Sequence, residues 1–156
     1  MYFKQTMKLA VLTSLISASL SFSAIAADKA LIIGVGKYQD ARNNLPGIDL
    51  DIANFKRAIK RLGVKDKNIK VLQDSQATMK NARKAMKTWF SDVSANDKVF
   101  FYFSGHGSQM DDLNGDEEDN VDEFLVMHDF VPNKSGAFTD DDLGVLLKGI
   151  PSQNVY

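Results

Sequence analysis

The fold is decided by the stretch Lys98-Val99-Phe100-Phe101-Tyr102-Phe103-Ser104-Gly105-His106-Gly107. From Val99 to Phe103 it is apolar without a break, which is typical of a β-strand buried on both faces of a sheet. Glycines on both sides of His106 then let the backbone turn sharply and leave the imidazole accessible. We therefore predict a strand over 97–104 with a histidine at its carboxyl end.

Two more apolar runs, 30–35 and 69–72, precede this strand, and a helical pattern follows each of them. The first helix is predicted over 49–62, where apolar residues recur at steps of three or four and form one buried face, with Gly63 as the stop. That face consists of Ile52, Phe55, Ile59 and Leu62. The second helix is expected to begin at the cap Thr78 and to bury Met79, Ala82, Met86 and Trp89 or Phe90.

Strand, helix, strand, helix, strand with short connections predicts a parallel sheet covered by helices. We expect an α/β fold, a three-layer α/β/α sandwich with right-handed crossovers. Residues 105–139 are polar and acidic, and only Glu123–Met127 resembles a strand there. A short helix over 140–147 and a fourth strand beginning at Asn154 complete the pattern. Because the sequence stops as this strand begins, we expect a domain that is incomplete at its carboxyl terminus.

The first 26 residues have the features of a secretory signal peptide. Lys4 and Lys8 form a basic start, an apolar run follows, and Ala24-Ile25-Ala26 supplies the small residues of a cleavage site. Five serines interrupt the run, which is short for a membrane span, and this favours a signal peptide over the alternatives, a retained transmembrane anchor or a buried helix. We predict that the mature chain begins near Ala27 and is secreted or periplasmic.

Composition excludes several classes of function. Without the signal peptide the chain keeps 17 basic and 20 acidic residues, a net charge of −3, which favours neither nucleic acid nor an anionic membrane as a partner. The sequence has no cysteine, so disulfides are excluded and no thiol nucleophile is present. Gly34-Val35-Gly36 lacks the third glycine of a dinucleotide-binding loop, and no organic cofactor is expected.

His106 is the candidate catalytic residue. Reactive groups gather at the carboxyl ends of the strands in open α/β sheets, and an imidazole titrates near neutral pH. The alternative is a loop histidine without a chemical role. His128, the other histidine, follows an apolar stretch, and no role is assigned to it.

Six segments resemble a known family in the same order along the chain. The segment 102–107 resembles the catalytic-histidine motif of metacaspases and related bacterial caspase-like cysteine peptidases, the peptidase C14 type. The other five are 30–35, 45–51, 114–117, 122–125 and 138–143. The resemblance implies a caspase-like domain over 27–156, with a nucleophilic cysteine at the end of the fourth strand, a few residues beyond Tyr156.

The resemblance also implies roles for individual residues. His106 would polarise the thiol and protonate the leaving amine, and the N–H of Gly107 would donate to the developing oxyanion. Asp51 and Ser104 match positions in the pocket that receives Arg or Lys of a polypeptide substrate. An exposed acid at a helix start is the alternative for Asp51.

The acidic segment suggests calcium. Asp122, Asp140 and Asp141 match calcium ligands of calcium-activated metacaspases, and Ca²⁺ prefers several carboxylate oxygens. An EF-hand loop is one alternative, since Asp112, Asn114, Asp116 and Glu123 take its first, third, fifth and twelfth positions, although Glu117 replaces its glycine. A solvated acidic loop without metal is the other.

The predicted function is therefore that of a cysteine endopeptidase that cleaves after Arg or Lys and is activated by calcium. The 156 residues alone lack the nucleophile and are expected to be inactive. The alternative is a catalytically inactive caspase-like domain that acts in binding or regulation. A receiver-like signalling domain shares the α/β pattern but needs an acidic pair after the first strand, where this chain has Gly34-Val35-Gly36.

Overall fold

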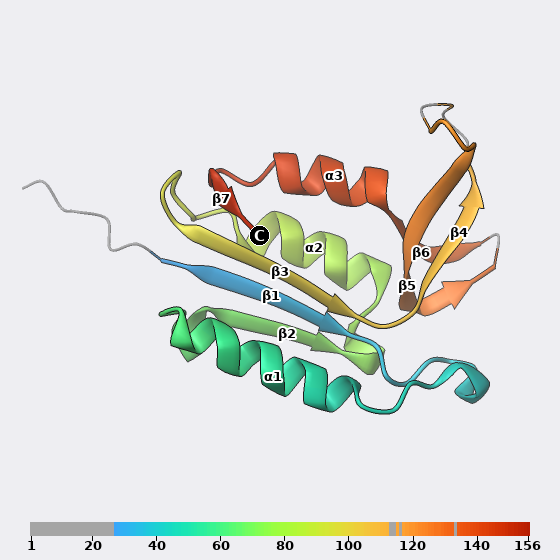
Figure 1. Cartoon of the computed structure of the whole chain (residues 1–156), viewed down its shortest axis with the longest axis horizontal. Helices are drawn as coiled ribbons and strands as arrows, with labels where there is room; N and C mark the ends of the chain where they lie inside the picture. Colours follow the sequence, from blue (N-terminus) through green and yellow to red (C-terminus); the bar gives the residue numbers. More distant parts are fainter. Residues whose placement is uncertain (1–26, 113–114, 116, 133) are drawn as a thin grey trace, which may run out of the picture.

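Four parallel strands form the centre of the molecule in a computed structural model, which describes residues 27–112, 115, 117–132 and 134–156 (Figure 1). The elements are β1 (Lys29–Gly34), η1 (Ala41–Asn43), α1 (Ile48–Arg61), η2 (Asp66–Asn68), β2 (Ile69–Gln73), η3 (Asp74–Gln76), α2 (Met79–Trp89), β3 (Lys98–Ser104), β4 (Gly107–Asp111), β5 (Val121–Val131), β6 (Ser135–Thr139), α3 (Asp140–Lys148) and β7 (Asn154–Val155). The predicted signal peptide, residues 1–26, lies outside the described residues.

The four-stranded sheet has the order β2-β1-β3-β7, and all of its pairs are parallel. The helix α1 covers one face and α2 the other, while α3 lies beside α2 (Figure 1). This arrangement confirms the predicted α/β sandwich. The pairs Lys98↔Asn154 and Val99↔Val155 confirm the fourth strand and place it at the edge next to β3.

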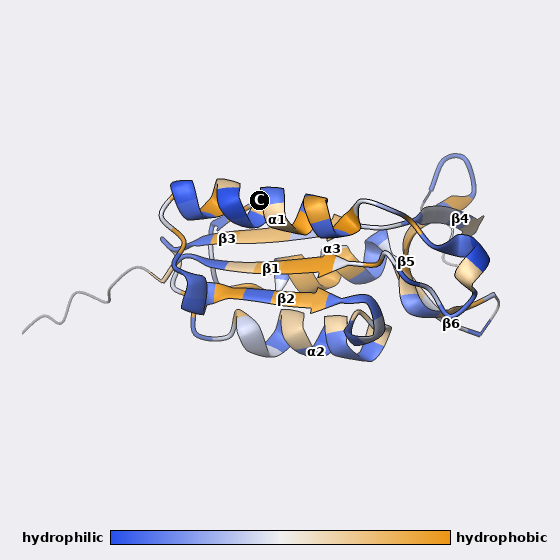
Figure 2. Cartoon of the chain, turned by 90° about the horizontal axis from the view of Figure 1, so that it is seen from below, coloured by the Kyte–Doolittle hydropathy of each residue, from blue (hydrophilic) through white to orange (hydrophobic). Residues whose placement is uncertain are grey.

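The strand β1 is buried on both faces because side chains alternate across it. Ala30 and Ile32 pack with Ile52 and Ile59 of α1, while Leu31 and its neighbours on the opposite face pack against α2. Figure 2 shows the hydrophobic colour along β1. Burying an isoleucine side chain contributes roughly 1.5–3 kcal/mol, so these contacts hold the layers together.

One residue of the first helix departs from the prediction. Leu62 is 59% exposed, whereas Val64 is 2% exposed and packs in the core. The helix ends at Arg61, and Gly63 adopts a left-handed φ of 103°, which turns the chain. The N–H of Val64 donates to the Ile59 carbonyl at 3.1 Å, so that Val64 packs in the core where Leu62 was expected.

The next two helices begin at threonine caps. Thr78 Oγ1 accepts a hydrogen bond from the Asn81 N–H at 3.2 Å, which confirms the predicted cap of α2. Thr139 Oγ1 accepts one from the Asp142 N–H at 3.2 Å at the start of α3. Within the described ranges, no helix is both long and apolar enough to cross a bilayer.

A second sheet with the order β4-β5-β6 is antiparallel and occupies most of the segment 105–139. The prediction of only one short strand there was wrong. Most side chains of β4 are exposed, so this strand has no apolar pattern and is held by its backbone pairing with β5. Phe124, Val126 and Phe138 add the buried face of this sheet to the core on the α2 side.

Candidate active site

His106 lies in the turn that joins the two sheets, between β3 and β4. Its N–H donates to Tyr38 Oη at 2.8 Å, and its carbonyl accepts from the Val126 N–H at 2.9 Å. Tyr38 belongs to the loop after β1, and Val126 lies in β5. The backbone of His106 is therefore held from both sheets.

The imidazole of His106 is oriented by a third segment. Its Nε2 lies 2.9 Å from the carbonyl oxygen of Asn43 in η1, and its ring centroid lies 5.1 Å from that of Tyr38. A carbonyl oxygen can only accept, so Nε2 carries the hydrogen in this contact. In a neutral ring, Nδ1 is then the basic nitrogen that can take a proton.

The two glycines beside His106 serve different purposes. A Cβ on Gly105 would come within 2.7 Å of Phe103 Cζ and 3.0 Å of Tyr38 Oη, so Gly105 permits the close approach of the tyrosine. A Cβ on Gly107 would meet nothing closer than the Phe124 carbonyl oxygen at 3.7 Å. Space is therefore open beside the histidine on the Gly107 side.

The loop that carries Tyr38 is held by side chains from other elements. One oxygen of the Asp74 carboxylate accepts the N–H groups of Gly36 and Lys37 at 2.9 and 2.8 Å. His128 Nδ1 lies 2.7 Å from the Lys37 carbonyl oxygen. His128, which had no role in the sequence-based prediction, thus supports the loop that orients His106.

The Tyr38 hydroxyl stays protonated at neutral pH. Burial raises its pKa above the usual value, and this exceeds the lowering by the hydrogen bond from the His106 N–H. The hydroxyl can therefore accept from His106 while it donates to the Val126 carbonyl at 3.4 Å.

Two cavities meet at the turn after His106. The smaller, of about 290 Å³, is lined by His106, His128, Tyr38 and Asn43 among others. The larger, of about 720 Å³, lies between the three-stranded sheet and the start of α3, where Asp140 lines it. Gly107 and Ser108 line both cavities.

Asp51 and Ser104 lie together, as their predicted common role requires. Ser104 Oγ donates to Asp51 Oδ2 at 2.7 Å. Both residues are half-buried, Asp51 in the first turn of α1 and Ser104 at the end of β3. Asp51 is therefore not simply an exposed acid at a helix start.

The predicted calcium ligands come from two neighbouring elements. Asp122 is buried in β5, and Asp140 and Asp141 are exposed in the first turn of α3. The pair Phe124↔Thr139 brings the two elements side by side. Over the described ranges, however, no group of three or more His, Cys, Asp or Glu side chains is placed to hold a metal ion.

The EF-hand alternative is wrong. An EF-hand loop connects two helices, whereas the strands β4 and β5 flank this loop. Asn114 and Asp116 lie outside the described residues. The carboxylate of Asp112 accepts the N–H groups of Gly115 and Glu117 at 2.7 and 3.1 Å, and Glu123 accepts from the Gln109 side chain at 2.8 Å.

Comparison with known proteins decides the family. A profile described as the caspase domain matches residues 27–155. The chain belongs to the caspase domain family. It is 36% identical over 126 residues to metacaspase-1 of Kluyveromyces lactis, and 37% identical over 122 residues to metacaspase-1B of Neurospora crassa.

These alignments cover 76% and 74% of this chain but only 28% of each metacaspase. The chain thus spans less than a third of the curated relatives that it matches. A structural-genomics protein from Geobacter sulfurreducens has a similar fold, with a TM-score of 0.63 and 24% identity over 82% of this chain and 47% of that one. Family membership supports a cysteine-peptidase-like domain.

In this caspase domain, sequence motifs pointed to His106, Asp51 and Ser104 but missed the residues that orient the histidine. Tyr38 lies in the loop after β1, Asn43 in the short helix η1 and Asp74 in the short helix η3, and together they form no periodic pattern. Their importance follows only from hydrogen bonds across long sequence separations, such as the 68 positions between Tyr38 and His106. No local signal could have identified them.

Proposed function

We propose that this domain belongs to a cysteine endopeptidase in which His106 is the general acid–base. The observation that carries the proposal is a hydrogen bond of His106, which follows the carboxyl end of β3. Its Nε2 binds the carbonyl oxygen of Asn43 in η1. It fixes the ring orientation and supports the positive charge that the ring takes up when Nδ1 accepts a proton. This is the arrangement of a base oriented by a third group.

The position of β7 agrees with a thiol supplied from beyond Tyr156. Val155 pairs with Val99, and Ser104 lies five residues after Val99. A strand that continued in this register would reach the level of Ser104 four residues after Tyr156, next to the turn of His106. The family resemblance puts the nucleophilic cysteine at about this distance.

With a cysteine supplied from beyond Tyr156, the site would hydrolyse a peptide bond in two stages. The thiol gives its proton to Nδ1 of His106, and the thiolate attacks the carbonyl carbon of the scissile peptide bond. The imidazolium returns the proton to the leaving amine, and water later hydrolyses the acyl-enzyme. The N–H of Gly107, beside open space, would donate to the developing oxyanion.

Cleavage after Arg or Lys is supported by the pair of Asp51 and Ser104. The serine hydroxyl holds one carboxylate oxygen of a half-buried Asp51, which orients a negative charge near the end of β3. A carboxylate held in this way can bind a guanidinium through two parallel hydrogen bonds, or an ammonium as a point charge. The substrates proposed are polypeptides with a basic residue before the cleaved bond.

Calcium activation is supported only by the acidic segment and the resemblance. The three carboxylates of Asp122, Asp140 and Asp141 do not form a metal-holding group in the described structure, so no catalytic step is assigned to calcium. Titration calorimetry of the whole protein tests calcium binding. Heat that saturates at millimolar calcium or below, and is lost in Asp140→Asn, supports the proposal, whereas the absence of heat removes it.

Export to the periplasm or the medium is proposed from residues 1–26, with their basic start, apolar run and small residues before Ala27. The cellular fraction that contains the protein tests this part. Recovery only from the cytoplasm, with residue 1 intact, would contradict it.

The decisive experiment uses the whole protein purified from its natural source. Intact mass and peptide sequencing past Tyr156 establish whether a cysteine follows. If it does, His106→Ala should lower the rate of hydrolysis of Arg and Lys peptides by about 100-fold or more, since acid–base catalysis contributes about 10²–10⁴-fold. A His106→Ala protein with unchanged activity and fold would overturn the proposal.

The matched variant Asp51→Asn separates specificity from chemistry. It should abolish the preference for Arg and Lys while His106 remains able to transfer protons. A natural chain without cysteine would instead favour the alternative, a catalytically inactive caspase-like domain that acts in binding or regulation.

A further inference from the structure

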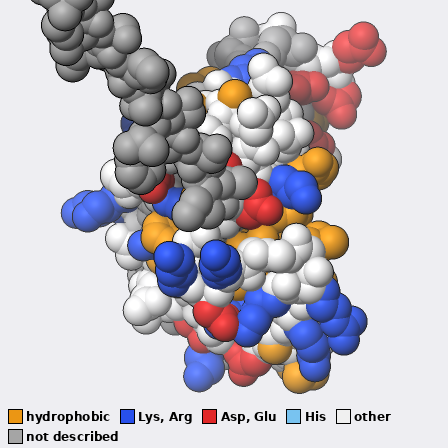
Figure 3. All heavy atoms as spheres, turned by 90° about the vertical axis from the view of Figure 1, so that its left-hand side faces the viewer, with side chains coloured by type: hydrophobic (Ala, Val, Ile, Leu, Met, Phe, Trp, Pro, Cys, Tyr) orange, Lys and Arg blue, Asp and Glu red, His pale blue; other side chains and the backbone are white. Residues whose placement is uncertain are grey.

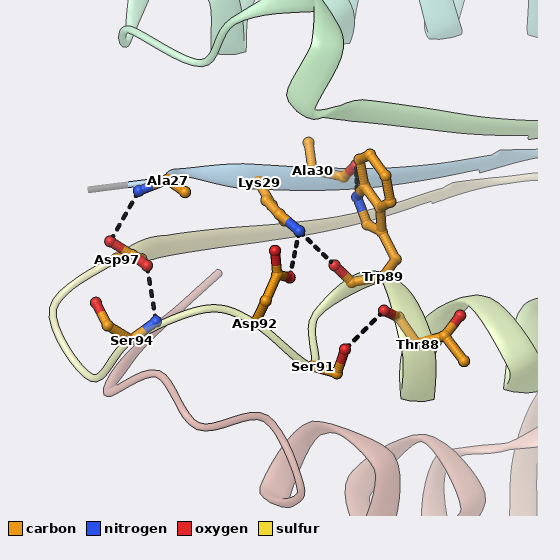
Figure 4. A network of polar contacts seen from close by, with 9 residues as sticks. All are labelled: Ala27, Lys29, Ala30, Thr88, Trp89, Ser91, Asp92, Ser94 and Asp97. Atoms are coloured by element: carbon orange, nitrogen blue, oxygen red, sulfur yellow. Dashed lines mark hydrogen bonds and ion pairs between the residues drawn. The ribbon is translucent and has the colours of Figure 1, made fainter. Parts of the chain in front are cut away.

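The amino end of the four-stranded sheet contains a buried carboxylate that binds the backbone nitrogen of Ala27 (Figure 4). Asp97, just before β3, is only 3% exposed. Its Oδ1 accepts from the Ala27 nitrogen at 3.0 Å, and its Oδ2 accepts from the Ser94 N–H at 2.7 Å. Both carboxylate oxygens thus have a hydrogen-bond donor.

The described residues give the Asp97 carboxylate two hydrogen bonds but no ionic partner. In the part of the chain that the structure describes, no lysine or arginine forms an ion pair with it. Lys29, the nearby buried lysine, binds Asp92 and the Trp89 carbonyl instead. The two N–H donors already stabilise the negative charge of Asp97, and a cation at the Ala27 nitrogen would add an ion pair to them.

Figure 3 shows Lys, Arg, Asp and Glu side chains on this end of the molecule, but among the described residues none forms an ion pair with Asp97. Asp28 accepts from the backbone N–H of Lys98 at 2.8 Å, and the Lys98 side chain is exposed. Asp92 adds a further negative charge. Asp97 is ionised at neutral pH because the Ser94 N–H, the largest influence, lowers its pKa.

Cleavage of the signal peptide would supply a cation at Ala27. Ala24-Ile25-Ala26 ends directly before Ala27 and has the small residues of a signal-peptidase site. Hydrolysis of the Ala26–Ala27 peptide bond consumes one water and leaves a carboxylate on Ala26 and a primary amine on Ala27. This amine takes up a proton near neutral pH and becomes an α-ammonium group.

We infer that removal of residues 1–26 creates an ion pair between the new α-ammonium group of Ala27 and the buried carboxylate of Asp97. The signal peptide would therefore do more than direct export, because its cleavage converts a hydrogen bond from a neutral amide to a carboxylate into an ion pair. The inference rests on the proposed export and is independent of peptidase activity.

The ion pair would tie together the starts of three strands. Ala27 precedes β1 and Asp97 precedes β3, and the two strands pair from Lys29↔Val99 onward. Ser152 Oγ donates to the Asp97 carbonyl at 2.5 Å just before β7. Processing at one end of the sheet would therefore stabilise the strand that leads toward His106 at the other end.

The first step of the test is the amino-terminal sequence of the protein exported with its own leader. Ala27 as the first residue is expected, and a different first residue would overturn the inference. In the folded protein, the pH dependence of α-amine acylation should then give a pKa about one unit or more above the usual value of roughly 7.7–8.0, since an opposite charge within bonding distance has this effect.

Two variants test whether the Asp97 carboxylate causes the raised pKa of the α-amine. Asp97→Asn should return the α-amine to its ordinary pKa, whereas Asp92→Asn removes the same charge nearby and should leave the raised pKa in place. Should Asp97→Asn not fold, the exported protein in urea provides the comparison, because unfolding must abolish the shift. An ordinary α-amine pKa in the folded protein, or one that Asp97→Asn does not change, overturns the inference.

Discussion

The two sheets differ in the interactions that stabilise them. In the four-stranded sheet β1 is wholly buried, and helices cover both faces of the sheet. The three-stranded sheet has one buried face, and its strand β4 is mostly exposed. The first sheet is thus a frame stabilised by burial, and the second depends on backbone pairing and turn geometry.

The candidate active site lies where the two sheets meet. His106 connects β3 to β4, and its backbone bonds reach Tyr38 on one side and Val126 on the other. Its geometry therefore depends on both sheets at once. The following changes test each sheet and then the junction.

The largest effect is expected from Gly136→Ala in the three-stranded sheet. Gly136 has a φ of 82°, and a Cβ there would lie 2.3 Å from the backbone Cα of Phe130, which cannot move away. We expect the free energy of unfolding in urea to fall by about 4 kcal/mol or more. Gly107→Ala is the control in the same sheet, since its Cβ has room. Equal effects would contradict the argument.

Ile59→Ala tests the four-stranded sheet. Ile59 is 1% exposed and packs beneath β1, so its truncation should cost about 3 kcal/mol of unfolding free energy. Leu62→Ala, one helical step further along the same predicted face, should cost less than about 1 kcal/mol because Leu62 is exposed. Urea denaturation of both variants measures the difference. A larger loss for Leu62→Ala would show that the predicted helical face was right.

Gly105→Ala acts at the junction. The added methyl would push against Phe103 and the Tyr38 hydroxyl, whose side chains can shift, so we expect a loss of about 1–2 kcal/mol. In the whole protein, peptide hydrolysis should fall by about 10-fold or more because His106 is displaced. Gly144→Ala in α3, where a Cβ meets open space, is the control for both measurements.

The smallest stability effect is expected from Tyr38→Phe. It removes the acceptor of the His106 N–H while the ring remains, which costs about 1 kcal/mol. If Tyr38 only positions His106, the proposed acid–base, kcat of the whole protein should fall while KM stays nearly unchanged. A raised KM with unchanged kcat would instead place Tyr38 in substrate binding.

The sequence alone determined the strands β1 and β3, the helices α1 and α2, and the position of His106. Each of these rests on neighbours in the chain: a continuous apolar run, a period of three or four residues, or a glycine bracket. Local burial and backbone geometry decide such features. The family resemblance around Asp51 and Ser104 also pointed to one site, where the structure joins the two residues by a hydrogen bond.

The tertiary structure alone decided the three-stranded sheet, the exchange of Leu62 for Val64 in the core, and the contacts that orient His106. Polar strands form when a partner strand satisfies their backbone, and a partner far along the chain leaves no periodic trace. The same holds for the bond from Ala27 to Asp97, which spans 70 positions. Hydrogen bonds between distant segments depend on the packing of the whole domain, which local patterns do not record.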